Sequence, residues 1–167
     1  MSDIRLETER LTLVPFTSSD AQLLLAGIRR PDWSTGYPTE GDLVIARMIA
    51  KNPASFVSTN RFGPYTVIER TRRLWIGGVG FMGPPDRDGA VELGYGIASE
   101  WWNRGMATEA VCGLLELAWS QPSVSRVFAR TEPSNMASAR VVEKAGMFFV
   151  GMENELRHYA VVRQHDT

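Results

Sequence analysis

The segment from Val91 to Ala118 limits the possible folds more than any other part of the sequence, because a strand pattern turns there directly into a helix pattern. Val91 to Ala98 alternates large apolar residues with Gly and Glu, which is typical of a strand. From about Gly105 to Ser120, apolar residues recur at helical spacing, as Ala107, Val111, Leu114 and Ala118 do. The segment therefore places the N-terminus of a helix at the end of a strand, where phosphate groups can bind.

The other strand and helix patterns surround this segment in a mixed order. One strand pattern and two helix patterns come first, three strand patterns follow, and the chain then continues as helix, strand, helix and two strands. This order predicts an α+β fold with a largely antiparallel mixed sheet. The length fits one domain over residues 1–167. The expected strands are 11–16, 65–68, 74–81, 91–98, 124–131, 148–152 and 158–163, and the expected helices are 21–29, 39–51, 105–120 and 135–145. Either Thr39 or Asp42 is expected to cap the second of these helices.

The composition excludes several classes of protein. The formal net charge of -1 and the isoelectric point of about 6.1 predict no nucleic-acid partner. The single cysteine, Cys112, cannot form an internal disulfide and is expected to be a small core residue. Neither His158 nor His165 has neighbours at metal-ligand spacing, so no metal is predicted. No signal peptide or long apolar run is present, which predicts a cytoplasmic protein without a membrane partner.

Gly78 to Gly83 has the G-x-G-x-x-G spacing of dinucleotide-binding proteins, but a turn at Pro84 to Gly89 follows it. The dinucleotide fingerprint needs a helix at that point, so these glycines predict a strand end with close backbone packing instead. No G-x-x-x-x-G-K-[ST] or G-x-S-x-G sequence occurs. A P-loop is therefore excluded, and a serine nucleophile has little support.

The turn before the third expected helix, Trp102 to Ala110, is the remaining candidate phosphate site. Backbone N–H groups in the first turn of a helix have no partner within the helix, and the helix dipole favours an anion there. The side chains of Arg104 and Thr108 can add contacts to a diphosphate. An ordinary helix start capped by Asn103 is the alternative. The predicted binding residues are Arg104, Gly105, Met106, Ala107 and Thr108.

At these residues the sequence resembles the GNAT superfamily, and more closely its branch of ribosomal-protein N-terminal acetyltransferases. Trp102 to Ala110 is similar to the W-x-x-G-x-A-T-E-A form of the cofactor loop in that branch, with Trp where the general motif has Arg or Gln. Glu9 to Leu13 and Glu92 to Tyr95 also match. So does Asn135 to Ser138, which leads to Glu143 to Gly146.

The resemblance implies a GNAT-like α/β/α fold with about seven strands and about four helices. It implies that the fourth and fifth strands, Val91 to Ala98 and Arg126 to Thr131, splay apart and hold acetyl-CoA between them. The acceptor would be an amine, and the family also allows a homodimer.

The fourth strand supplies the first catalytic candidate, Glu92. Strand alternation places Glu92 on one face with Gly94 and Gly96, where the glycines predict either a bulge or a pantetheine chain against the backbone. Glu92 would be the base that deprotonates the amine, and the alternative is a solvent-facing strand residue. N–H groups at Ile97 and Ala98 would bind the thioester oxygen.

Asn135 and Ser138 lie three residues apart at the start of a helix, so both side chains can point to one side. The resemblance implies that Asn135 binds the pantetheine or phosphate part of the cofactor and that Ser138 faces the sulfur as a second catalytic residue. Helix capping after Pro133 is the alternative for both.

These residues predict acetyl transfer to a primary amine by direct attack in a ternary complex, because no activated nucleophile is visible. A non-catalytic acyl-CoA-binding or protein-interaction module is the alternative. The acceptor stays open among peptide N-termini, amino sugars, polyamines and antibiotic amines. The breaker-rich segment 30–38 is a candidate lid for the acceptor site, and four aromatic residues are candidates for its lining, with packing as the alternative: Trp33, Tyr37, Trp75 and Trp101.

Overall fold

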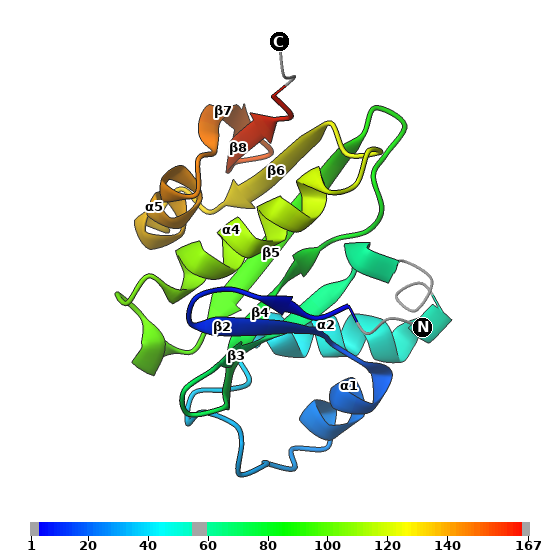
Figure 1. The fold of residues 1–167 in the computed structure, drawn as a ribbon, viewed down its shortest axis with the longest axis vertical. Coiled ribbons are helices and arrows are strands. Elements are labelled where there is room, and N and C mark those ends of the chain that lie inside the picture. The colour runs from blue at the N-terminus through cyan, green and yellow to red at the C-terminus, as the bar shows by residue number, and fades with distance from the viewer. Residues whose placement is uncertain (1–3, 55–59, 165–167) are drawn as a thin grey trace.

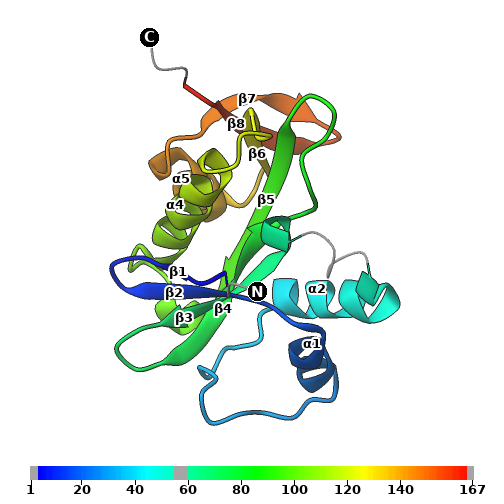
Figure 2. The ribbon, with the colours of Figure 1, turned by 45° about the vertical axis from the view of Figure 1, so that its right-hand side comes forward.

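The structure, a computed structural model, describes residues 4–54 and 60–164 and consists of three layers. Helices α4 (Met106–Trp119) and α5 (Met136–Lys144) cover one face of a sheet, and α1 (Ser18–Leu25) and α2 (Glu40–Lys51) lie on the other face (Figure 1, Figure 2). The predicted α+β class and α/β/α arrangement are confirmed. No helix in the described part of the chain is long and apolar enough to span a membrane.

The sheet has eight strands in the described residues, in the order β1-β2-β3-β4-β5-β6-β8-β7, rather than about seven. The additional strand, β1, is only two residues long, which is too short to show an alternating pattern in the sequence. Only β5 and β6 pair in parallel. The strands are β1 (Leu6–Glu7), β2 (Leu11–Pro15), β3 (Pro64–Glu69), β4 (Leu74–Phe81), β5 (Ala90–Ile97), β6 (Arg126–Thr131), β7 (Phe148–Glu153) and β8 (Leu156–Val162).

The parallel pair β5–β6 separates part-way along its length. Ala90 to Glu92 pair with Arg126 to Phe128, and no later residue of β5 pairs with β6. Beyond that point β5 stays paired with β4 as far as Ile97, while β6 stays paired with β8 as far as Thr131. The predicted splay between these two strands is confirmed, and it opens a gap beside the second half of β5.

The main core lies between the sheet and α4. Val111, Leu114 and Ala118 are fully buried on the α4 face that the 3.6-residue pattern predicted. Cys112 is exposed, so the expectation that it belongs to the core was wrong. It follows Val111 by one residue, and one residue is about 100° around the helix, which turns its side chain off the buried stripe.

A second core cluster lies under α1 and α2 and contains the aromatic residues of segment 30–38. Trp33 and Tyr37 are buried and pack edge-on, 5.2 Å between ring centroids, and Trp75 joins them. Trp101 is buried in the main core. Packing, the alternative for all four aromatic residues, is therefore confirmed, and they do not line an open acceptor site.

Helices α1 and α2 begin with the same local device, a capping box. Thr17 and Asp20 exchange hydrogen bonds at the start of α1, and Thr39 and Asp42 do so at the start of α2. Of the two caps that the sequence left open for α2, Thr39 and Asp42, the structure has Thr39 as the N-cap. Helix α1 ends at Leu25 rather than at residue 29, because Gly27 leaves the helix with a φ of +71°.

Candidate active site

Helix α4 begins in a glycine turn that leaves its first N–H groups exposed to a ligand. Gly105 is the N-cap in the left-handed conformation, with φ +76°, and no side chain caps the helix. The alternative of a cap at Asn103 is therefore wrong. Met106 contributes only its backbone, because its side chain is buried in the core, whereas Ala107 and Thr108 are partly exposed. The donors that the sequence predicted are available where β5 leads into α4.

A partly buried network holds this turn against β2. Glu109 of α4 accepts hydrogen bonds from the Thr8 hydroxyl, from the Arg10 backbone N–H at 2.8 Å and from Arg10 Nε at 2.8 Å. Arg10 Nη1 also donates to the backbone oxygen of Arg104, at 2.8 Å. The Arg104 guanidinium lies over the Trp101 ring, 5.0 Å from its centroid. Sequence reasoning missed the role of Arg10, although Glu9 to Leu13 carried part of the family resemblance.

Burial by itself raises the pKa of the Glu109 carboxyl, but the hydrogen bonds from Thr8 and Arg10 and the Arg10 charge outweigh burial. The pKa of Glu109 therefore lies below its ordinary value. The ionised carboxylate stabilises the fold, and this contribution is present above the unfolded-state pKa and is lost as the pH falls through the folded-state pKa.

We expect Glu109→Gln to lower the free energy of unfolding by about 2 kcal/mol at pH 7.5, because hydrogen bonds to a charged acceptor become neutral ones. Acetyl-CoA affinity should fall severalfold with it, since the turn loses its anchor. Thermal unfolding over a pH series downward from 7.5 measures the first effect, and the difference from the parent should shrink as the pH falls through the folded-state pKa of Glu109, which lies below the ordinary value. Glu116→Gln, an exposed site on the same helix, is the control. Equal stability of both variants at pH 7.5 would contradict the anchoring role of Glu109.

The free edge of β5 turns alternate backbone groups toward the gap. Glu92 O accepts from the N–H of Met82 at 2.9 Å, and the N–H of Ala98 donates to Ile76 O at 2.7 Å, so even-numbered residues of β5 face β4. The N–H groups of Tyr95 and Ile97 consequently face the gap. Ala98 cannot supply the predicted donor because Ile76 already holds its N–H, whereas Ile97 can.

Gly94 and Gly96 do not form the bulge that was one of the two sequence predictions. Leu93 to Ile97 pair with Gly77 to Phe81 in unbroken register, so the gap arises because β6 departs and not because β5 bulges. Gly96 leaves room for the start of α2, since a Cβ there would lie 3.3 Å from Thr39 Oγ1. The close packing predicted for Gly80 is confirmed, with a Cβ only 2.6 Å from the Pro64 Cα.

Glu92 is held in a bidentate ion pair with Arg130 of β6. The Nε–Oε1 and Nη2–Oε2 distances are 2.7 and 2.8 Å. The pair joins β5 to β6 at the last position where the two strands are in register. The guanidinium engages both carboxylate oxygens, so Glu92 has to break this ion pair before either oxygen can contact an acceptor amine.

Asn135 and Ser138 lie at the start of α5, as predicted. Asn135 Oδ1 accepts the N–H of Ser138 at 3.0 Å, so the capping alternative is confirmed for Asn135. The Tyr95 hydroxyl from β5 lies 2.8 Å from Ser138 O and 2.5 Å from Ser138 Oγ. Burial raises the pKa of Tyr95. Sequence reasoning missed Tyr95. Its contact brings two hydroxyl groups together between β5 and α5, the element that follows β6.

A cavity of about 270 Å³ lies on the opposite face of the sheet, between α2 and strands β3 to β5. The backbone of Gly78, Gly80, Gly94 and Gly96 and the side chain of Asp42 line it. Burial raises the pKa of Asp42 to about 6, against the lowering effect of its hydrogen bonds with Thr39. Sequence reasoning treated Asp42 only as a capping residue.

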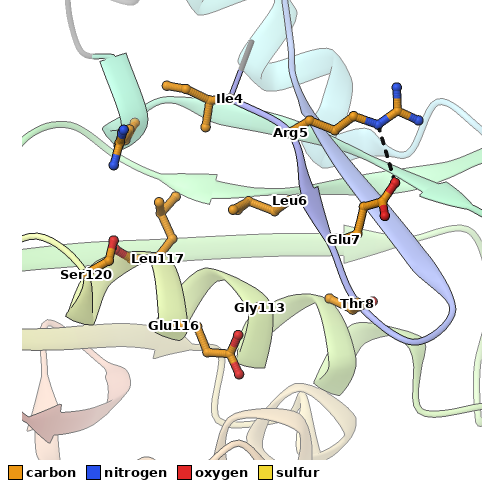
Figure 3. A pocket seen from close by; sticks show the side chains of 10 residues that line it. Ile4, Arg5, Leu6, Glu7, Thr8, Gly113, Glu116, Leu117 and Ser120 are labelled. Atoms are coloured by element: carbon orange, nitrogen blue, oxygen red, sulfur yellow. Dashed lines mark hydrogen bonds and ion pairs between the residues drawn. The ribbon is translucent and has the colours of Figure 1, made fainter. Parts of the chain in front are cut away.

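A second cavity, of about 360 Å³, lies between β1 and the C-terminal half of α4 (Figure 3). Glu7, Thr8, Gly113, Glu116 and Leu117 are among the residues that line it. Because it is distant along α4 from the glycine turn, it is not part of the candidate site. Within residues 4–54 and 60–164, no group of His, Cys, Asp or Glu side chains is arranged to hold a metal ion.

The turn and the gap fit a coenzyme A molecule. Exposed N–H groups at a helix N-terminus suit its pyrophosphate, and the unpaired edge of β5 suits the amide-containing pantetheine chain. Residues 10–148 match the family model described as an acetyltransferase (GNAT) domain. The chain belongs to the GNAT acetyltransferase family. As a member it is an N-acetyltransferase that uses acetyl-CoA.

Individual relatives agree with this assignment. The chain is 28% identical to the uncharacterized N-acetyltransferase YjdG of Bacillus subtilis (strain 168), over 95% of this chain and 98% of the relative. A putative ribosomal-protein-serine acetyltransferase from Vibrio cholerae superimposes with a TM-score of 0.70 at 17% identity, covering 96% of this chain and 98% of that one. RimL, a ribosomal alpha-N-protein acetyltransferase in complex with coenzyme A, gives 0.70 at 15% identity, with coverage of 95% and 97%.

Proposed function

We propose that this GNAT acetyltransferase transfers the acetyl group directly to a primary amine within a ternary complex. The observation that carries the proposal is that Gly94 to Gly96 of β5 contribute to two sites at once. Their free edge borders the gap between β5 and β6, and their other face lines the cavity that contains Asp42. An acyl donor in the gap and an amine in the cavity would therefore meet across one strand, without a covalent enzyme intermediate.

Acetyl-CoA supplies a thioester whose carbonyl carbon the amine attacks. The amine nitrogen forms a bond to that carbon, the carbon–sulfur bond breaks, and the nitrogen loses its protons to a base and to the leaving thiolate. Ile97 N–H is the donor for the oxygen that gains charge, an effect worth about 3 kcal/mol in other acyl transfers. The hydroxyls of Tyr95 and Ser138 are the candidate donors to the sulfur, whose thiol pKa near 8.5 makes it a tolerable leaving group.

Turnover with acetyl-CoA and a panel of primary amines tests this function, with the acetylated product detected by mass spectrometry. Solved structures of the same fold include a ribosomal-protein-serine acetyltransferase and a spermidine N-acetyltransferase chimera, so the panel needs peptides, polyamines and simple monoamines. Acetyl-CoA binding without any product would favour the non-catalytic module. The cytoplasmic location and the homodimer stay predictions from the sequence.

Glu92→Gln distinguishes a structural from a catalytic role of Glu92. Because the Arg130 pair joins β5 to β6 at the splay, we expect the variant to bind acetyl-CoA severalfold more weakly while kcat at saturating acetyl-CoA changes less than about tenfold. Steady-state kinetics with varied acetyl-CoA measures both effects. A kcat loss of a hundredfold or more with unchanged acetyl-CoA affinity would instead restore Glu92 as the base, since general bases contribute about that much.

A further inference from the structure

The cavity under α2 has apolar walls and a single carboxylate among the residues that line it. Phe16, Val44, Ile45 and Met82 contribute apolar side chains. Glycine backbone forms its floor, and Asp42 is the one acidic residue among the described residues that line it. Within the same part of the chain, no lysine or arginine lines it. A ligand that matches this cavity has an apolar body and one positive charge.

Asp42 uses only one of its two carboxylate oxygens within the fold. Oδ2 accepts from the Thr39 N–H and from Thr39 Oγ1, each at 2.8 Å. The described residues give Oδ1 no hydrogen bond, and it faces Gly78, where a Cβ would lie only 2.5 Å away. Glycine at position 78 therefore allows Oδ1 to approach the backbone of β4 closely.

The same capping box at the start of α1 shows what capping alone requires. There Asp20 also accepts from its Thr17, but that box lies at the surface. In α2 the carboxylate is half-buried, its charge acts on the phenol of Tyr37, and Tyr65 and Tyr95 line the same cavity. The charge of Arg61 acts on Tyr65, but no cation among the described residues acts on Asp42 itself. Because a partly desolvated carboxylate without a counter-ion is costly, an ammonium ion from outside would stabilise it.

We propose that this cavity binds an apolar primary monoamine and that Asp42 Oδ1 receives its ammonium group and then its proton. The proposal rests on the proposed function and names its acceptor class and its base. A second ammonium group, as in a polyamine, would lie unpaired against apolar walls, so polyamines are disfavoured. The backbone of a peptide acceptor would likewise leave amide groups without partners there.

The protons balance in this scheme. The acceptor enters as an ammonium ion, and one proton passes from its nitrogen to Asp42 Oδ1 and then to solvent. The free amine forms the carbon–nitrogen bond as the carbon–sulfur bond breaks, and the second proton that the nitrogen loses matches the one that the leaving thiolate takes up. A carboxyl group with a pKa of about 6 is a better acceptor for the first proton than an ordinary one with a pKa near 4.

Kinetics of Asp42→Asn and Asp20→Asn with 2-phenylethylamine, spermidine and a tetrapeptide with a free N-terminal serine tests the proposal. For the parent we expect kcat/KM with 2-phenylethylamine to exceed the other two by about tenfold or more. Asp42→Asn should lose about a hundredfold or more of that value with an unchanged acetyl-CoA Kd. Asp20→Asn, the same substitution in the same capping box, should stay within about twofold.

The pH profile and the melting temperature separate chemistry from folding. Parent kcat/KM should fall as the pH drops through about 6, where Asp42 takes up a proton, and this limb should be absent from Asp42→Asn. Asp42→Asn should melt no lower than the parent at pH 7.5. Equal effects of both Asn variants, or full activity of Asp42→Asn, would overturn the role of Asp42. Preference for spermidine or the peptide would overturn the acceptor class alone, and no turnover with any amine would overturn the proposed function as well.

Discussion

In the Gly105→Glu variant, calorimetric titration with acetyl-CoA should show an affinity at least about a hundredfold below that of the parent, a loss of about 2.7 kcal/mol. The added charge and the added side-chain volume both lower the affinity. The new carboxylate stands at the helix N-terminus, where the exposed N–H groups and the dipole would otherwise hold the pyrophosphate. Its Cβ would also lie 3.3 Å from Arg10 Nη2, which disturbs the network that fixes the turn.

Gly27→Glu is the matched control for this experiment. Gly27 also has a positive φ, +71°, so both variants pay the same backbone strain of about 1 kcal/mol. It follows α1, and a Cβ there would meet no atom within 4 Å. The control should bind acetyl-CoA as the parent does. If both variants bind normally, the glycine turn is not the pyrophosphate site and the placement of the cofactor is wrong.

Gly77→Ala should lower the free energy of unfolding by about 3 kcal/mol or more, the upper range for overpacked sites. A Cβ at Gly77 would lie 2.1 Å from Gly96 O and 2.9 Å from the Ile97 Cα. Both are backbone atoms that cannot rotate away, so β4 and β5 must separate. For a chain of this size the melting temperature should fall by about 6 to 12 °C, which differential scanning calorimetry measures.

Gly94→Ala provides the comparison within the same strand pair. Its Cβ would meet only Met82 Sδ, at 3.7 Å, which is ordinary contact with a flexible side chain. We expect its stability to lie within about 1 kcal/mol of the parent. If Gly77→Ala melts at the same temperature as Gly94→Ala, the strands are less closely packed than the structure shows.

The sequence predicted those features whose cause is local. The periodicity of Val91 to Ala118 located β5 and α4, and the two candidate caps, Thr39 and Asp42, located the start of α2 to within three residues. The sequence also predicted the glycine turn before α4, because consecutive residues determine where a helix starts and which of its N–H groups have no partner within the helix. The family resemblance then supplied the splay, which local patterns do not contain.

Contacts between distant residues were not predictable from such patterns. Arg10 and Glu109 are 99 residues apart, and Glu92 finds Arg130 only because β5 and β6 become neighbours in parallel register. Asp42 fulfilled the rule for a capping residue completely, so nothing in the chain indicated that its second oxygen would face a cavity. The position of Cys112, one residue beside the buried stripe, shows that an apolar neighbourhood in sequence does not decide the burial of a single residue.

The sheet separates the glycine turn of α4 from the cavity under α2, so the residues that line one do not line the other. The cofactor turn and its anchor belong to α4 and β2, whereas Val44 and Ile45 of α2 form a wall of the cavity across the sheet. The cavity floor is main chain, which a substitution changes only by adding a side chain. With the acceptor and the cofactor placed as we propose, replacements on α2 alone would change which amine is accepted and leave the cofactor-binding half of the enzyme unchanged.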